Sequence, residues 1–126
     1  MPKRRAKPQL GFQGRWNITS ISQWDEDYLH EEVHAFIEFL PNGLGEFQFG
    51  YVRGELDYRE GERQGKPAVE WTWDGNDEMD PAQGRGWAVL EGDELHGMFF
   101  IHLGDESDFV AERVATPRKA RRSSTP

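Results

Sequence analysis

The sequence predicts a mainly β protein: one domain folded as an eight-stranded, antiparallel up-and-down barrel, with room for one short helix in its first loop. Short runs rich in Phe, Trp, Val and Ile are separated by Pro, Gly and Asn, which is typical of antiparallel β proteins. There are eight such runs, the number of strands whose side chains can fill a small barrel. The length of 126 residues suits a single domain.

The first half of the chain contains four predicted strands. Residues 41–43 read Pro-Asn-Gly, a strong hairpin signal because Asn and Gly tolerate positive φ. Beyond this turn, Phe47, Phe49 and Tyr51 alternate with polar residues and would share one face of a strand. Residues 53–54, Arg-Gly, are expected to turn the chain again. The four strands are predicted over 15–22, 35–40, 46–52 and 55–59.

The second half contains four more strands. Val69, Trp71 and Trp73 alternate with polar residues, as expected for a strand with one buried face. A polar turn over 60–66 is expected before this strand, and a loop over 74–84 after it. The four strands are predicted over 67–73, 86–90, 94–103 and 108–115.

Charge is distributed unevenly along the chain. Residues 10–115 contain 7 basic and all 23 acidic side chains, a net charge of −16, whereas the first nine and the last eleven residues each carry +4. An acidic body argues against nucleic-acid binding through the folded surface. We expect 10–115 to form the barrel domain, with residues 1–9 and 116–126 as disordered basic tails.

Two absences narrow the class of protein. The chain has no cysteine, which excludes disulfides and thiolate metal sites and suits a cytoplasmic protein. No apolar run approaches the roughly 18 residues of a membrane-spanning helix, and the basic N-terminus is not followed by the apolar segment of a secretory signal. We therefore expect a cytoplasmic protein with no membrane span.

Three residues carry a resemblance to a known group of barrels. Gly14 and Trp16 form a Gly-x-Trp at the start of the first strand, and Arg113 lies in the last strand. This pattern resembles the signature of the calycins, the group of lipocalins and avidins, in which the tryptophan plugs one barrel end and a basic side chain stacks across it. The resemblance implies that Arg113 stacks on Trp16. It also implies that the acidic segment 23–34, either a helical turn or a long loop, covers the barrel mouth.

The calycin resemblance supplies no activity. The wider pattern of glycines and aromatic residues is also similar to a set of small bacterial proteins of about this length, which implies a bacterial protein.

Residues 30–34 read His-Glu-Glu-Val-His and match the H-E-x-x-H motif of zinc proteases. On a helix, His30 and His34 would lie on one face and bind Zn²⁺ while Glu31 activates water. Residues 35–40 read as a strand, however, so the long helix that this motif needs is not predicted. We interpret the match as coincidence and keep a metal-dependent hydrolase using His30, Glu31 and His34 as the alternative function.

The segment 74–80 offers a second metal candidate. Oxygen-bearing side chains occupy alternate positions, as in a Ca²⁺ loop: Asp74, Asn76, Glu78 and Asp80. The EF-hand pattern nonetheless fails, because Met79 and Arg85 stand where glycine and glutamate are required. We expect a solvated acidic loop here and no bound metal.

His102 precedes a turn that contains Ser107 and several aspartates, an arrangement that invites comparison with a catalytic triad. The sequence has no nucleophile elbow and no evident oxyanion hole. His96 lies six residues away along the same strand, too far to share a metal with His102. We expect a polar rim at this position.

The aromatic residues could fill the barrel or line a shallow cup for a planar or apolar ligand. Arg85 stands between two glycines beside Trp87, where its guanidinium could face an anionic ligand. We expect a non-catalytic module that binds an unidentified small molecule or protein, without a cofactor, at a mouth bounded by 23–34, 74–84 and Trp87. The candidate ligand-binding residues are Trp71, Trp73, Arg85, Trp87 and His102.

Overall fold

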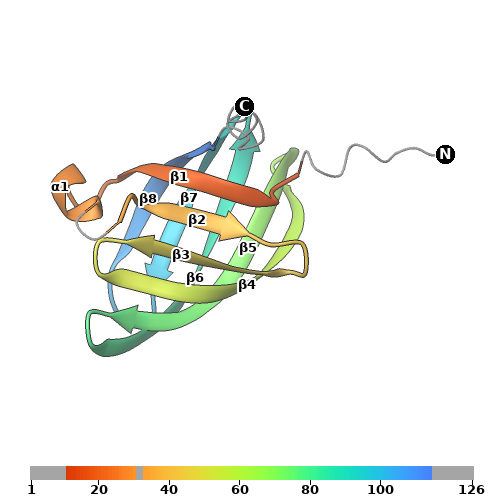
Figure 1. Ribbon diagram of the computed structural model, residues 1–126. Coiled ribbons are helices and arrows are strands. Elements are labelled where there is room, and N and C mark those ends of the chain that lie inside the picture. Colours follow the sequence, from red (N-terminus) through yellow and green to blue (C-terminus); the bar gives the residue numbers. More distant parts are fainter. Residues whose placement is uncertain (1–10, 31–32, 115–126) are drawn as a thin grey trace, which may run out of the picture.

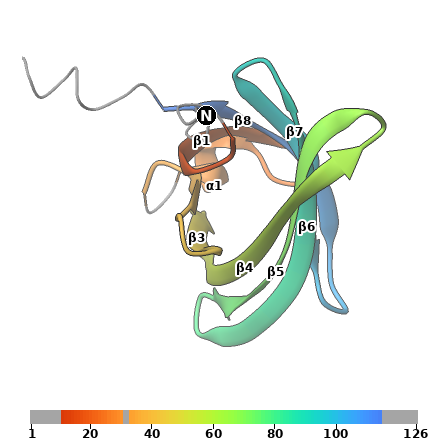
Figure 2. The same cartoon turned by 90° about the vertical axis from the view of Figure 1, so that its right-hand side faces the viewer.

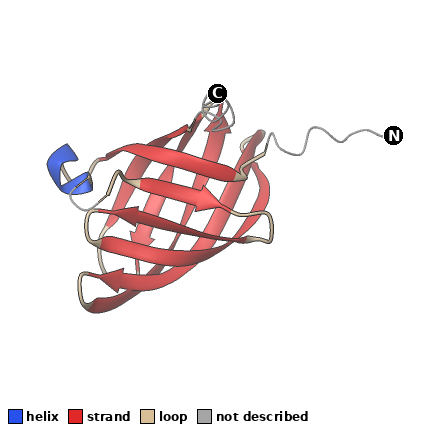
Figure 3. Cartoon of the chain, viewed as in Figure 1, coloured by secondary structure: helices blue, strands red, loops and turns tan. Residues whose placement is uncertain are grey.

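Eight antiparallel strands close into one barrel in which each strand pairs with its neighbours in sequence and the first pairs with the last (Figures 1 and 3). The computed structural model describes residues 11–30 and 33–114. The strands are β1 (Gly14–Ile21), β2 (Phe36–Phe39), β3 (Leu44–Phe49), β4 (Val52–Arg63), β5 (Lys66–Asp77), β6 (Asp80–Glu91), β7 (Glu94–Ile101) and β8 (Glu106–Arg113). These described residues also contain one helix, α1 (Glu26–Leu29). The predicted fold class is confirmed. The predicted basic tails lie outside the described residues and stay a prediction.

Strands β4, β5 and β6 are longer than the sequence indicates, with 12 residues each. The predicted turn at 53–54 is wrong, and the predicted turn over 60–66 and loop over 74–84 are too long, because each contains only a two-residue turn between strands. The chain instead reverses at 50–51, 64–65 and 78–79. The extra strand residues are mostly charged or glycine, types that are depleted in strands, yet the ladder pairs them in register from one hairpin tip to the next.

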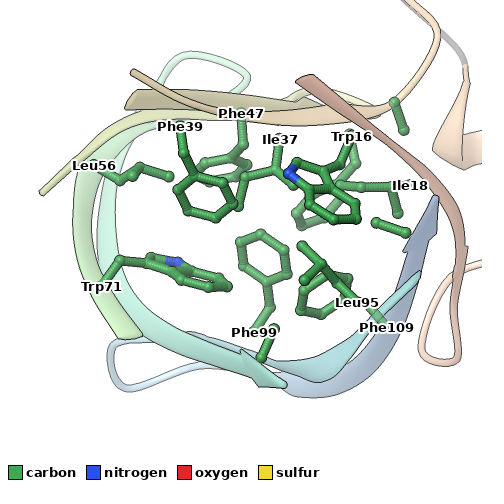
Figure 4. Packing of buried hydrophobic residues seen from close by; sticks show 14 of the residues in the cluster. Trp16, Ile18, Ile37, Phe39, Phe47, Leu56, Trp71, Leu95, Phe99 and Phe109 are labelled. Carbon is green, nitrogen blue, oxygen red and sulfur yellow. The ribbon is translucent and has the colours of Figure 1, made fainter. Parts of the chain in front are cut away.

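Aromatic side chains fill the barrel interior (Figure 4). Phe99 lies at the centre, with its ring centroid 4.9 Å from those of Phe47 and Phe109 and 5.5 Å from that of Trp71. Each of these four side chains is at most 3% exposed. Side chains from opposite walls therefore meet across the axis, and the interior is a packed core like that of other small barrels.

The barrel end where β1 begins and β8 ends is plugged by Trp16. Its side chain is fully buried, and its indole N–H donates a hydrogen bond to the carbonyl of Phe12 at 2.9 Å. The guanidinium carbon of Arg113 lies 4.3 Å from the Trp16 ring centroid, and the same side chain donates to the carbonyl of Gly11. The stack expected from the sequence is present, and it closes this end by cation–π attraction.

The opposite end is covered by α1 and the residues around it. Asp25 caps the helical turn by accepting a hydrogen bond from the Tyr28 backbone N–H at 3.0 Å. Leu29 is buried, and its carbonyl accepts from the Gly50 N–H at 2.8 Å. The Trp24 ring lies 5.2 Å from that of Phe49. The segment 23–34 therefore contains a helical turn that packs over this end of the barrel.

Burial changes the acidity of Tyr28, a residue of α1. The tyrosine hydroxyl accepts a hydrogen bond from the Tyr51 N–H at 3.3 Å. Desolvation of the ring raises the pKa of Tyr28 above its usual value of 10.0, despite that hydrogen bond. Tyr28 therefore stays neutral and structural at physiological pH.

Candidate binding surface on the outer face of the barrel

The candidate site lies on the outward side of β4 to β7, because the period of two along β6 places its large side chains outside. Gly86 and Ala88 occupy inward positions, so Arg85 and Trp87 face outward. The β6–β7 register sets Trp87 opposite Met98 and Arg85 opposite Phe100. The side chains of Trp87, Met98 and Phe100 are half-buried, and Arg85 is exposed. Four side chains from two neighbouring strands thus form one contiguous patch.

Two arginines lie flat on the aromatic rings of this patch. The Arg85 guanidinium carbon is 4.2 Å from the centroid of Phe100. The Arg63 guanidinium carbon is 3.8 Å from the centroid of Trp87, although Arg63 comes from the far end of β4, two strands away. Figure 2 shows the β4–β5 hairpin projecting beyond the barrel wall at this tip. Stacking holds both guanidiniums in place while leaving their in-plane N–H donors free to bind.

We call this surface the arginine–aromatic face and define it by six residues: Arg59, Arg63, Arg85, Trp87, Met98 and Phe100. Its central hollow has a volume of about 520 Å³, and its lining includes the three arginines, Trp87 and Phe100 together with two carboxylates, Asp57 and Glu70. A hollow of about 810 Å³ continues from Arg85 and Phe100 toward the β7–β8 turn. Another of about 450 Å³ continues from Arg63 and Trp87 past Met98. The volumes fall in the range of small-molecule sites.

None of the three arginines is neutralised by a carboxylate of the described chain. Within residues 11–30 and 33–114, Arg15, Lys66 and Arg113 each have a carboxylate oxygen within 4.0 Å, and Arg59, Arg63 and Arg85 have none. Glu70 stands directly opposite Arg59 in the β4–β5 register and still makes no such pair. Three guanidiniums that form no ion pair to the described residues therefore gather at one hollow of a strongly acidic domain.

The structure divides the five predicted ligand-binding residues between the interior and the outside. The rings of Trp71 and Trp73 are buried in the core, 3% and 4% exposed. Arg85, Trp87 and His102 lie on the outer side. Arg85 and His102 border the 810 Å³ hollow, and Arg85 and Trp87 border the central one. These residues do not surround a barrel mouth, because α1 covers that end and Trp87 faces away from the interior.

The H-E-x-x-H segment does not form the helix that a zinc protease needs. Helix α1 ends at Leu29, so His30 and His34 are not on one helical face. Their rings lie near each other, 4.6 Å between centroids, and His30 Nδ1 accepts a hydrogen bond from the Ala35 N–H at 3.1 Å. Glu31 lies outside the described residues. Across the part of the chain that the structure describes, no three or more His, Cys, Asp or Glu side chains gather as a metal site.

The acidic segment and the His102 region are built into the ladder and its turns. Asp74 and Asn76 pair with residues of β6 in the β5–β6 hairpin, and Glu78 occupies the tight turn with φ of 59°. Asp80 begins β6, so these four side chains line a hairpin and not a loop. Ser107 is buried and bonds Gln23 and Ser22, not His102. The geometry of a catalytic triad is absent here.

Sequence reasoning missed Arg59, Arg63, Met98 and Phe100 as members of the site. The signal for Met98 and Phe100 was their outward parity in a strand whose inward positions are already apolar. No local signal identifies Arg63, because its contact with Trp87 depends on how the hairpin curls in space.

Comparisons of the chain with protein-family models, curated proteins and solved structures find no match. The site is therefore interpreted from its own chemistry. Within the described residues, no helix is long and apolar enough to cross a membrane.

Proposed function

We propose that this protein is a non-catalytic binding module that takes its ligand on the arginine–aromatic face and not inside the barrel. One observation carries the proposal: Trp87, Met98 and Phe100 are large apolar side chains on the outward side of a barrel whose interior is already full. Outward positions of a half-solvated antiparallel sheet normally carry polar side chains. Apolar groups in a hollow, with a few fixed polar groups beside them, are what small-molecule sites use.

We also propose that the barrel is calycin-like and cytoplasmic, and that it comes from a bacterium. The Trp16–Arg113 stack at the terminal end supports the calycin relationship. The absence of cysteine from the sequence suits a reducing compartment. The bacterial source rests on the resemblance of the sequence pattern alone. The alternative of a metal-dependent hydrolase at His30, Glu31 and His34 has less support, because the required helix is not formed.

Methyl-labelled protein tests the location of binding. Two of the three methionines serve as a probe and its control. Met98 lies on the arginine–aromatic face, whereas Met79 is 90% exposed at the β5–β6 tip, away from that face. We expect that titration with a panel of small aromatic compounds shifts the Met98 methyl resonance and leaves that of Met79 in place.

Leu95 provides the control for entry into the barrel, because its side chain is fully buried in the interior. Compounds that shift the Leu95 methyl groups while Met98 stays unchanged would place the ligand inside and contradict the proposal. A panel that moves neither residue would contradict it as well.

A further inference from the structure

We propose that the central hollow of the arginine–aromatic face binds a small molecule that carries an oxyanion, a carboxylate or a phosphate, next to a flat ring. The inference rests on the proposed function and adds the chemical class of the ligand. Arg63 and Arg85 hold the oxyanion through their free N–H edges, and the ring of the ligand lies beside Phe100 or Trp87.

The state of the guanidiniums points to an anion. An arginine that stacks on a ring keeps its five N–H donors directed outward in the guanidinium plane, a geometry that matches carboxylate and phosphate oxygens. Arg59, Arg63 and Arg85 donate no hydrogen bond and form no ion pair to the described residues. Arg63 and Arg85 are nevertheless fixed on their rings at 3.8 and 4.2 Å. They are positioned donors without an acceptor.

The charge of the hollow supports the same conclusion. Its lining includes three arginines and two carboxylates, Asp57 and Glu70, and therefore carries a net charge of +1. The segment 10–115 carries −16. A positive hollow in such a domain selects anions locally, because interactions at contact distance are screened by salt less than those across the surface.

The overall charge argues against a second copy of this chain as the occupant. Each chain carries a net charge of −8, so two copies repel each other, and an isologous contact would also bring the three arginines of one copy near those of its partner. A small anion meets neither obstacle. The volume of about 520 Å³ accommodates a single substituted ring.

Four probes of similar size test the proposal: phenyl phosphate, benzoate, benzamide and benzylamine. Affinities of the full-length chain are measured from the Met98 methyl shift. We expect at least one of the two anions to bind about tenfold or more tightly than neutral benzamide, because charge-assisted hydrogen bonds exceed neutral ones by that amount. Benzylamine should bind most weakly. A preference for phenyl phosphate over benzoate would identify a phosphate ester as the ligand class, and the reverse a carboxylate.

Variants separate the site from the general charge of the protein. Arg63→Gln and Arg85→Gln should each weaken anion binding about tenfold, as the loss of one charge-assisted contact predicts. Arg53→Gln is the matched control, because Arg53 is exposed on the same strand as Arg63 and outside the hollow. It should leave affinity unchanged. Arg63→Lys keeps the charge and loses the planar fork, so it should bind phenyl phosphate less tightly than the unaltered chain does.

Two results would overturn the inference. If benzamide shifts Met98 with the affinity of the anions, the face binds rings without regard to charge, and the proposed function stands while the ligand class falls. If Arg53→Gln weakens binding as much as Arg63→Gln does, the anions respond to overall charge and not to the hollow.

Discussion

Two tryptophans of β5, Trp71 and Trp73, differ in whether their buried indole N–H groups are hydrogen-bonded. Trp71 and Trp73 are both buried and both pack on the central aromatic rings. Trp73 Nε1 donates a hydrogen bond to the carbonyl of Phe100 at 3.2 Å. Trp71 Nε1 is buried and has no hydrogen-bond partner among the described residues. The two side chains therefore have similar apolar surroundings, but only the indole N–H of Trp73 has a hydrogen-bond acceptor among the described residues.

Trp73→Phe should therefore destabilise the protein more than Trp71→Phe does. Both substitutions remove the same atoms from a packed interior and cost a similar cavity term. Only Trp73→Phe also breaks a hydrogen bond and leaves a part-buried carbonyl with one partner fewer, which adds about 1 kcal/mol. Chemical denaturation of the two variants gives the difference in the free energy of unfolding. Equal losses, or a larger loss for Trp71→Phe, would show that the N–H of Trp71 is satisfied in solution.

At the scale of single residues, the sequence predicted well where the side chain itself carries the signal. Trp16 and Arg113 could be paired because an indole and a guanidinium attract each other wherever the fold brings them together. Arg85 and Trp87 could be selected as ligand-binding candidates, but the sequence did not predict that they lie on the outer face of the barrel. Their outward direction follows from Gly86 and Ala88, two small residues that fit the crowded interior positions of β6.

Glycine lets the backbones of two neighbouring strands, β6 and β7, approach each other closely. A Cβ atom on Gly97 would lie 1.9 Å from the carbonyl oxygen of Trp87 on the neighbouring strand. That contact is far inside van der Waals range, so β6 and β7 can pair here only without a side chain. Gly97 pairs with Ala88, next to the Trp87–Met98 pair, so this close backbone contact lies in the wall that carries the arginine–aromatic face.

Gly97→Ala should destabilise the protein by about 1–3 kcal/mol or more, as overpacking of a close backbone contact does. Gly61→Ala is the matched control: Gly61 is in β4, and a Cβ there has nothing within 4 Å. Alanine should be neutral or slightly stabilising at position 61. Thermal unfolding of both variants checks the pair. Equal melting temperatures would mean that the β6–β7 contact relaxes without cost.

At the scale of elements, strand number and order could be predicted from local alternation, whereas strand ends could not. The interior alternation of Val69, Trp71 and Trp73 is visible in the sequence. The residues at 60–63 and 74–77 are extended because a partner strand supplies their hydrogen bonds. That partner is specified by the closure of the whole barrel and not by the residues themselves. The contact between Arg63, at the β4–β5 hairpin tip, and Trp87 could not be predicted from the sequence for the same reason.

The whole molecule combines a full interior with two covered ends. Trp16 and Arg113 close one end, and α1 closes the other. Core rings meet across the axis (Figure 4). A ligand inside would have to displace packed aromatic side chains, each of which contributes several kcal/mol to the core. The arginine–aromatic face requires no such displacement, since its hollows are open and its guanidiniums form no ion pair to the described residues.

The most direct test of this account is a crystal structure of the full-length chain soaked with phenyl phosphate at millimolar concentration. The account predicts the phosphate between Arg63 and Arg85 on the outer face, the ring beside Phe100 or Trp87, and an unchanged core around Phe99. A ring found inside the barrel among Phe47, Trp71 and Phe99, or an outer face without ligand, would contradict it.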